Sequence, residues 1–193
     1  MLRRTERGFS LVELMVAMVA GLGVVLCITS LYMALLRTDE SLMARIHLQQ
    51  GLQFLLDSIE RDVRRAGYAP ATSPTTSSSW PGLYWSTRCV LMGMDMDEDG
   101  VLAGEQELRG YRFNPIRQRL EVRSWLLPPA DPEVACRSSG WQDMTDGQLQ
   151  ITAFALSRVD AASNLLSMQV TAQDPRRPQQ EVHDARYMQL RNW

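Results

Sequence analysis

The pattern of hydrophobic positions divides the chain into two parts near residue 36. From Phe9 to Leu36 the only charged residue is Glu13, and residues 14–36 read as one apolar run, LMVAMVAGLGVVLCITSLYMALL. At about 1.5 Å rise per residue, a helix of this length crosses a hydrocarbon core of about 30 Å. The pattern therefore predicts a membrane-spanning helix over residues 9–36.

The next segment keeps a helical period but becomes amphipathic. Between Ser41 and Ala66 the apolar residues fall on one face and the charges on the other, and Gly67 is a suitable C-terminal cap. We therefore expect residues 37–67 to continue the same helix outside the membrane, with an apolar stripe that needs a partner. The expected stripe consists of Leu42, Ile46, Leu52, Leu55, Leu56, Ile59 and Val63.

The remaining residues, 68–193, predict a β-rich globular head. A Ser/Thr/Pro-rich loop follows Tyr68, and turn signals occur at Asn114-Pro115 and over residues 160–164. We predict an α+β fold in which an antiparallel meander packs on the helix. The expected strands are Leu83–Met94, Leu108–Phe113, Arg119–Leu127, Gln148–Val159, Leu165–Gln173 and Ala185–Leu190.

Charge changes the interpretation of the apolar run. Arg3, Arg4 and Arg7 precede it, so the positive-inside rule predicts a cytoplasmic N-terminus and an exported head. The run is too long for a secretory signal peptide, and no small-x-small cleavage site closes it. The net charge of the chain is only −2, and its basic residues are scattered among acidic ones. This distribution gives no electrostatic footprint for nucleic acid.

Glu13 distinguishes this segment from an ordinary signal anchor, which is the alternative if only the apolar run is considered. A carboxylate in an apolar helix costs several kcal/mol in lipid unless it finds a partner. If the chain were cut after Gly8, Phe9 would carry a new terminal ammonium group. Glu13 would then lie about one helical turn away and could pair with that charge in its own or a neighbouring subunit.

The residues from Gly8 to Leu14, GFSLVEL, resemble the prepilin cleavage and methylation motif of type IV pilins and type II secretion pseudopilins. The resemblance implies that residues 1–8 are a leader, that a membrane prepilin peptidase cuts between Gly8 and Phe9, and that Phe9 is then N-methylated. It also implies that Glu13 neutralises the terminal amine of an adjacent subunit during assembly. Major pilins usually have Pro at the position of Ser30. Here Gly21 and Gly23 are the weak points, which permit either local melting or close helix packing.

A second resemblance covers the segment LQQGLQFLLDSIERDVRRAGY, which ends at Tyr68. It is similar to PilW-type minor pilins, whose signature corresponds here to Arg61, Asp62, Arg64, Ala66, Gly67 and Tyr68; the Leu190-Arg191-Asn192 end is also similar. The resemblance implies the type IV pilin fold and a role in pilus assembly or priming, near the tip. Implied partners are the prepilin peptidase, other minor pilins, the major pilin and the inner-membrane assembly platform. Taken alone, the Arg–Asp cluster indicates either a solvated face or a subunit contact.

The cysteines predict one disulfide. Cys89 and Cys136 both lie in the exported head, where oxidising conditions favour a bridge. The alternative is two buried free thiols. Cys27, inside the apolar helix, is interpreted as a small apolar filler.

An acidic segment is the candidate metal site, although no cofactor is required by the predicted function. Asp95, Asp97 and Asp99 alternate before Gly100, as in the first half of an EF-hand loop that binds Ca²⁺. The backbone carbonyl of Val101 and the carboxylate of Glu105 complete the candidate ligand set. The twelfth position of such a loop is Gln106, between Glu105 and Glu107, and no flanking helix pair is expected. A solvated acidic hairpin turn is the alternative.

The sequence contains no motif of an enzyme. It lacks GxSxG, HExxH, a P-loop and a dinucleotide fingerprint, and its two His residues, His47 and His183, are far apart. The alternatives to a minor pilin are a J-like minor pseudopilin of a type II secretion system, a DNA-binding competence pilin and, least favoured, a membrane-anchored periplasmic enzyme.

Overall fold

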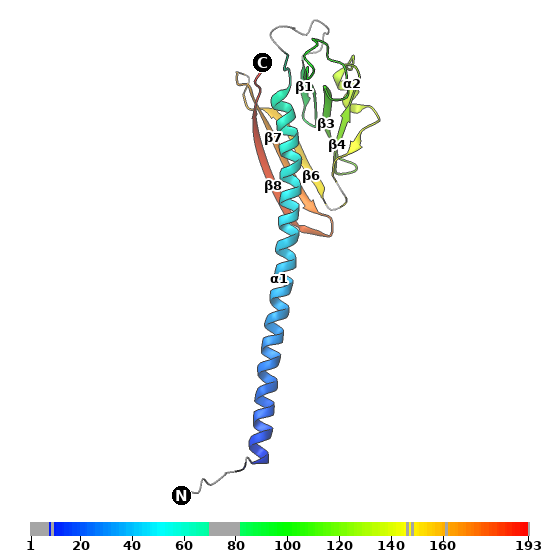
Figure 1. Ribbon diagram of the computed structural model, residues 1–193. Helices are drawn as coiled ribbons and strands as arrows, with labels where there is room; N and C mark the ends of the chain where they lie inside the picture. Colours follow the sequence, from blue (N-terminus) through cyan, green and yellow to red (C-terminus); the bar gives the residue numbers. More distant parts are fainter. Residues whose placement is uncertain are drawn as a thin grey trace. The chain divides into compact units, whose positions relative to one another are not determined.

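The computed structural model describes residues 8, 10–69, 82–145, 147, 149–160 and 162–192; side chains of residues 37–41 are not described. The chain divides into two compact units, residues 1–44 and 45–193. One helix, α1 (Leu11–Arg65), contributes residues to both units (Figure 1). The expected Ser/Thr/Pro-rich loop lies largely outside the described residues.

The first unit is the N-terminal part of α1. Residues Leu11–Leu36 are long and apolar enough to span a membrane, and their side chains are exposed throughout. The helix continues without a break through Gly21 and Gly23. The hydroxyl of Thr29 donates to the carbonyl oxygen of Val25 at 2.8 Å, and that of Ser30 to Cys27 at 2.8 Å. These bonds satisfy polar groups within the helix, as a lipid environment requires.

The second unit contains two antiparallel sheets rather than one meander. The five-stranded sheet runs in sequence order, and each strand pairs with the next. Its strands are β1 (Leu83–Ser86), β2 (Cys89–Gly93), β3 (Leu108–Asn114), β4 (Arg119–Ser124) and β5 (Gln142–Asp143). A short helix, α2 (Pro132–Arg137), precedes β5 and is capped by Asp131, whose carboxylate accepts the amides of Glu133 and Val134.

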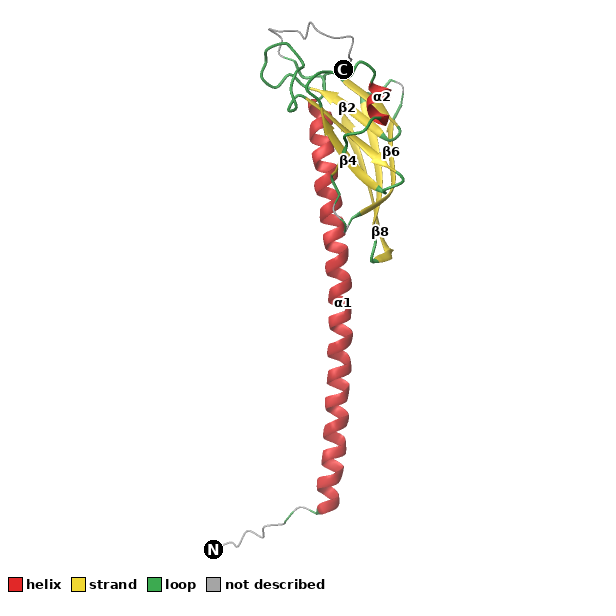
Figure 2. Cartoon of the chain, turned by 90° about the vertical axis from the view of Figure 1, so that its right-hand side faces the viewer, coloured by secondary structure: helices red, strands yellow, loops and turns green. Residues whose placement is uncertain are grey.

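The second sheet is formed by the last three strands, which also pair in sequence order. Figure 2 shows strands of the head beside the C-terminal part of α1. They are β6 (Gln150–Arg158), β7 (Leu165–Asp174) and β8 (Arg177–Gln189). Backbone hydrogen bonds connect the two sheets: the amide of Ile151 donates to Gln118 at 2.9 Å, and that of Leu156 to Thr87 at 3.0 Å. The head is therefore one folded body built from two sheets.

Both sheets share one hydrophobic core with the C-terminal part of α1. The buried helix residues repeat at spacings of three and four, which places them on one face. They are Leu48, Leu52, Leu55, Leu56, Ile59 and Val63.

The predicted stripe was wrong at its N-terminal end. Leu42 and Ile46 are exposed, and Leu48 is buried instead. Ile46 precedes Leu48 by two residues, which turns it about 200° around the helix, away from the face that carries Leu48 and Leu52.

The α+β fold is confirmed, but several strands differ from expectation. The segment predicted as one strand over residues 83–94 is a hairpin, β1–β2, with its turn at Thr87 and Arg88. β8 begins at Arg177, eight residues before the predicted Ala185. The helix α2 and the two-residue strand β5 were not predicted. The turns after Asn114 and Asp160 are present as expected.

Candidate functional site

The N-terminal segment positions the residues of the predicted processing site. Gly8 is exposed, whereas Phe9 lies outside the described residues. Helix α1 begins at Leu11, and the amide of Leu14 donates to the carbonyl oxygen of Ser10 at 3.1 Å. Glu13 lies in the first turn, where the helix dipole stabilises a carboxylate. Its carboxyl group thus lies at the start of an apolar helix.

The apolar surface that follows Glu13 is unusually large for a water-soluble chain. Residues Leu11–Leu36 span about 39 Å as a helix, and Leu22 and Ile28 each keep 63% of their surface exposed. Isolated apolar residues are normal on a surface, but a continuous exposed patch of this kind marks a membrane or an interaction site. This part of α1 therefore needs lipid or other helices around it.

The Arg–Asp signature at the end of α1 is mainly an internal connection of the head. Asp62 is buried, and its Oδ2 accepts the Tyr111 hydroxyl at 2.6 Å and the Arg109 Nη1 at 3.2 Å. Burial, followed by the hydrogen bond to Asp62, raises the pKa of Tyr111 to about 12. Arg64 pairs with Glu60 one turn away at 2.5 Å. Asp62 is thus neither solvated nor free for a subunit contact.

The end of the chain returns to the end of α1. The side-chain amide of Asn192 donates to the carbonyl oxygen of Ala66 at 2.9 Å, and Leu190 is buried in the core. Gly67 has a φ of +72°, and its amide donates to Gly93 in β2 at 2.8 Å. Left-handed backbone of this kind favours glycine at the end of a helix. Two segments that carry the PilW resemblance therefore meet at one junction.

The predicted disulfide is present. Cys89 at the start of β2 is bonded to Cys136 in α2, 47 residues further along, with a Cα–Cα distance of 6.1 Å. A buried cluster containing Leu91 and Trp141 surrounds the bridge. Cys27 is free and exposed on α1, within the apolar part of the helix, so its interpretation as a small apolar filler there stays a prediction.

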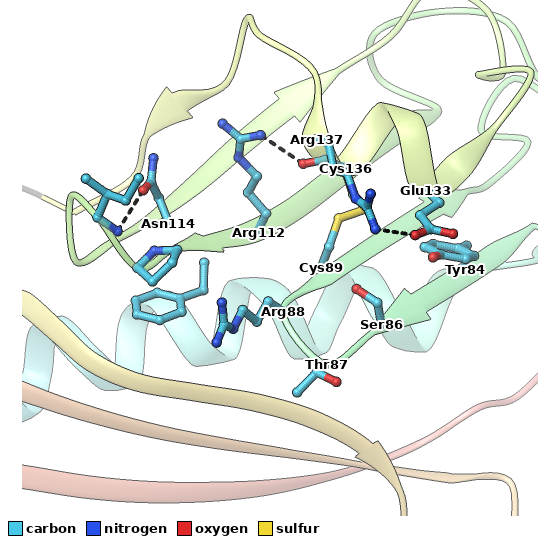
Figure 3. A pocket seen from close by; sticks show the side chains of 13 residues that line it. Tyr84, Ser86, Thr87, Arg88, Cys89, Arg112, Asn114, Glu133, Cys136 and Arg137 are labelled. Carbon is cyan, nitrogen blue, oxygen red and sulfur yellow. Dashed lines mark hydrogen bonds and ion pairs between the residues drawn. A yellow bond between two sulfur atoms is a disulfide. The ribbon is translucent and has the colours of Figure 1, made fainter.

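An open hollow of about 760 Å³ lies beside the disulfide (Figure 3). Its one lining carboxylate, Glu133, is paired with Arg137, and Arg112 donates to Glu121 and to the carbonyl oxygen of Cys136. The lining contains no His and no free Cys. Among the described lining residues there is therefore no Ser–His or Cys–His pair of the kind that activates a nucleophile.

Most head arginines with described contacts are engaged with carboxylates. Glu121, which is buried, accepts Arg112 Nε at 2.6 Å and lies 3.6 Å from Arg117. Arg117 also pairs with Asp143 at 3.0 Å. Arg186 lies 3.4 Å from Asp57 on α1. These pairs neutralise the positive charge that a nucleic-acid surface would require.

The acidic loop connects β2 to β3, and it brings three of the predicted ligands together. Asp95, Asp97 and Asp99 each place one carboxylate oxygen within 4.8 Å of the others. Glu105 is exposed and does not belong to this group. The amide of Val101 donates to Asp99 Oδ1 at 2.7 Å.

The sequence did not predict the role of Glu107 in this loop. Glu107 is buried, and its two oxygens accept backbone amides from Met96, Asp97 and Ala103. Its only signal was a carboxylate one position beyond the twelfth residue of the EF-hand pattern. Asp97 accepts the Asp99 amide, which lowers its pKa, but burial and the nearby charges of Asp99, Glu107 and Asp95 outweigh this and raise its pKa.

Comparisons with known proteins agree with the processing segment and the head. A family model described as "Prokaryotic N-terminal methylation motif" matches residues 3–22. A second, "Prepilin peptidase-dependent protein B", matches residues 41–190, which is most of the chain. Neither a curated protein nor a solved structure matches the chain. Pilin-family domains are structural proteins. The chain thus belongs to the prepilin peptidase-dependent protein B family and is a minor type IV pilin-like protein.

Proposed function

We propose that this protein is a PilW-like minor pilin that takes part in the assembly or priming of a type IV pilus, near its tip. The observation that carries the proposal is the position of Glu13. It lies in the first turn of α1, whose residues 11–36 are apolar and exposed, within the matched methylation motif and four residues after Phe9. An unpaired carboxylate there is costly in lipid, and a neighbouring amine would offset that cost.

The proposed mechanism is association. The prepilin peptidase cuts between Gly8 and Phe9 and methylates the new amine. The chain is then a single-pass protein of the inner membrane with a cytoplasmic N-terminus and a periplasmic head. During assembly, Glu13 pairs with the amine of an adjacent subunit and the exposed faces of α1 pack against other helices. Gly21 and Gly23 have open space around them, which suits close helix approach.

The nearest alternative is a J-like minor pseudopilin of a type II secretion system, because it would share the processing and the helix. A DNA-binding role is less well supported, since the head arginines described above are largely paired with carboxylates. The favoured partners are other minor pilins, the major pilin and the assembly platform.

The proposal is tested by complementing a deletion strain with a Glu13→Gln variant. The variant should lose its leader normally but restore surface pili at least about tenfold less than the wild type, because an ion pair in lipid is worth more than the 1.4 kcal/mol that a factor of ten represents. Glu6→Gln, which changes a leader residue, is the matched control and should restore pili fully.

Normal piliation by Glu13→Gln would contradict the pairing mechanism. Loss of secreted enzymes with intact surface pili in the deletion strain would identify the secretion pseudopilin instead.

A further inference from the structure

The carboxylate of Asp95 is buried and incompletely satisfied. The residue is 0% exposed; its Oδ2 accepts the Gly100 amide at 2.9 Å, while its Oδ1 receives no hydrogen bond from the described residues. A buried polar atom without a partner costs roughly 1–3 kcal/mol, and more if it is charged. Such an atom requires an explanation, and a bound cation is one of the few that suit a carboxylate.

The surroundings of Asp95 point to that cation. One oxygen from each of Asp95, Asp97 and Asp99 lies within 4.8 Å of the other two. Calcium binds oxygen at about 2.3–2.6 Å, so two ligands of one ion are separated by at most about 5 Å. The observed spread fits a single shared ion, and the cation would offset the mutual repulsion of three carboxylates.

The loop is held in this arrangement by its own backbone and by Glu107. Glu107 Oε1 accepts the Met96 amide at 2.7 Å, and its Oε2 accepts the Ala103 amide at 2.9 Å, so one side chain holds both arms of the loop. Gly100 has a φ of +81°, which provides the sharp turn after Asp99. Glu107 therefore positions the loop rather than binding the ion.

We propose that Asp95, Asp97 and Asp99 form a Ca²⁺ site in the β2–β3 loop of the head. Carboxylate oxygens are ligands for both Ca²⁺ and Mg²⁺, but a loop with irregular geometry suits calcium, because magnesium demands a near-ideal octahedron and retains its waters. With three clustered carboxylates and no completing bidentate Glu at the twelfth position, the site should bind in the range of about 10⁻⁴–10⁻³ M that is typical of extracellular modules.

The site is placed to stabilise the junction at the end of α1. The amide of Asp95 donates to the carbonyl oxygen of Tyr68 at 2.9 Å, and the Tyr68 hydroxyl donates to Glu98 at 3.1 Å. An ion on Asp95 therefore fixes the segment that leaves the helix as well as the loop itself. The head would meet millimolar calcium only if it is exported, as the proposed function requires. Calcium binding to the purified protein does not depend on that export.

The test is thermal unfolding of the full chain in detergent, followed by tryptophan fluorescence, with Ca²⁺ or Mg²⁺ added to chelator-treated protein. Calcium at tenfold its dissociation constant should raise the Tm by about 3–6 °C, from linkage and the usual dependence of Tm on stability for a chain of this size. Isothermal titration of the same sample should give one site per chain.

Variants then test the ligands. Asp97→Asn and Asp99→Asn, both at exposed positions, should fold and lose most of the calcium shift, whereas Glu105→Gln in the same loop should keep it. An unchanged Tm at about 10 mM Ca²⁺, tenfold above the weakest expected dissociation constant, would overturn the proposal. An equal rise in Tm with Mg²⁺ would also overturn it. Loss of the shift in Glu105→Gln but not in Asp97→Asn would overturn the ligand assignment. None of these outcomes depends on pilus assembly, so they are independent of the Glu13 experiment.

Discussion

The two ends of α1 have the same secondary structure and opposite environments. Over residues 11–36 every side chain is exposed, although almost all are apolar. Over residues 45–65, one face of the helix is an apolar stripe in which Leu56 and Ile59 are fully buried, and the other positions are mainly polar. The same helical backbone therefore serves two purposes. One end presents apolar surface to partners outside the chain, and the other is stabilised by the sheets of its own head.

Residues of one type therefore have different energetic roles along this chain. A Leu, Cys or Tyr in the head should control the free energy of unfolding, whereas its counterpart at the N-terminal end of α1 should control only association. Three comparisons test this, and each sets residues of the head against a residue of the same type in the exposed helix.

The largest effect is expected for the cysteines. Replacing Cys89 and Cys136 with Ala should lower the free energy of unfolding by roughly 4 kcal/mol, from the entropy of a 47-residue loop. Cys27→Ala should leave it unchanged, because that thiol is free and exposed. Urea unfolding in detergent measures both changes. Mass analysis of the unfolded wild type should show one alkylation without reductant and three with it; three without reductant would refute the bridge.

The leucines are expected to give a slightly smaller difference. Leu56 is 0% exposed, so Leu56→Ala leaves a cavity in the core. The substitution should lower the free energy of unfolding by about 3 kcal/mol, within the range for buried Leu-to-Ala changes. Leu22→Ala, at a position that is 63% exposed, should change the unfolding free energy by less than about 0.5 kcal/mol. Equal losses in the two variants, by the same urea measurement, would remove the distinction between the ends of α1.

The smallest effect concerns Tyr111 at high pH. Its folded pKa of about 12 lies above the unfolded value near 10, so the folded state holds the proton more tightly. The free energy of unfolding is therefore unaffected below pH 10 and falls between pH 10 and 12, by up to about 2.7 kcal/mol. Tyr111→Phe should reduce the slope of the unfolding free energy against pH between about pH 10 and 12. Tyr32→Phe, on the exposed helix, should retain the wild-type slope; loss of the slope in both variants would contradict the assignment.

The fold was predictable where the hydrophobic pattern is strong. The apolar run, the amphipathic stripe around Leu52–Val63 and the alternating strands β3, β4 and β7 all follow from spacing alone. The hairpin of β1 and β2 was missed because its turn, Thr87-Arg88, contains none of the residues that usually mark a two-residue turn. The first half of β8 is polar and half exposed, so it has no apolar alternation to read.

Helix α2 had a signal that was overlooked. Asp131, Pro132 and Glu133 provide a cap, a first helical residue and an acidic first turn, although three prolines over residues 128–132 leave no apolar helical period before it. Strand β5 has two residues and exists only through its pairing with β4, so local sequence could not indicate it.

The sites were predictable to a different degree. Asp95, Asp97 and Asp99 were found from their spacing, because ligands of one loop lie close in sequence. The partners of Asp62 could not be found in this way. Arg109 and Tyr111 are more than 45 residues away, and only the packing of β3 against α1 brings them to the carboxylate. Asn192 is 126 residues from the carbonyl group that it contacts.

The junction at the end of α1 also has a mechanical consequence. Tension applied to the head through the helix would be transmitted by the buried stripe and by bonds near the end of α1, which include the Asp62 bonds, the Gly67–Gly93 backbone bond and the Asn192–Ala66 bond. These bonds connect the end of α1 to β3, to β2 and to the C-terminal end of the chain, so the tension would be distributed over several elements of the head. The resistance of the head to tension therefore depends on residues at both ends of its sequence.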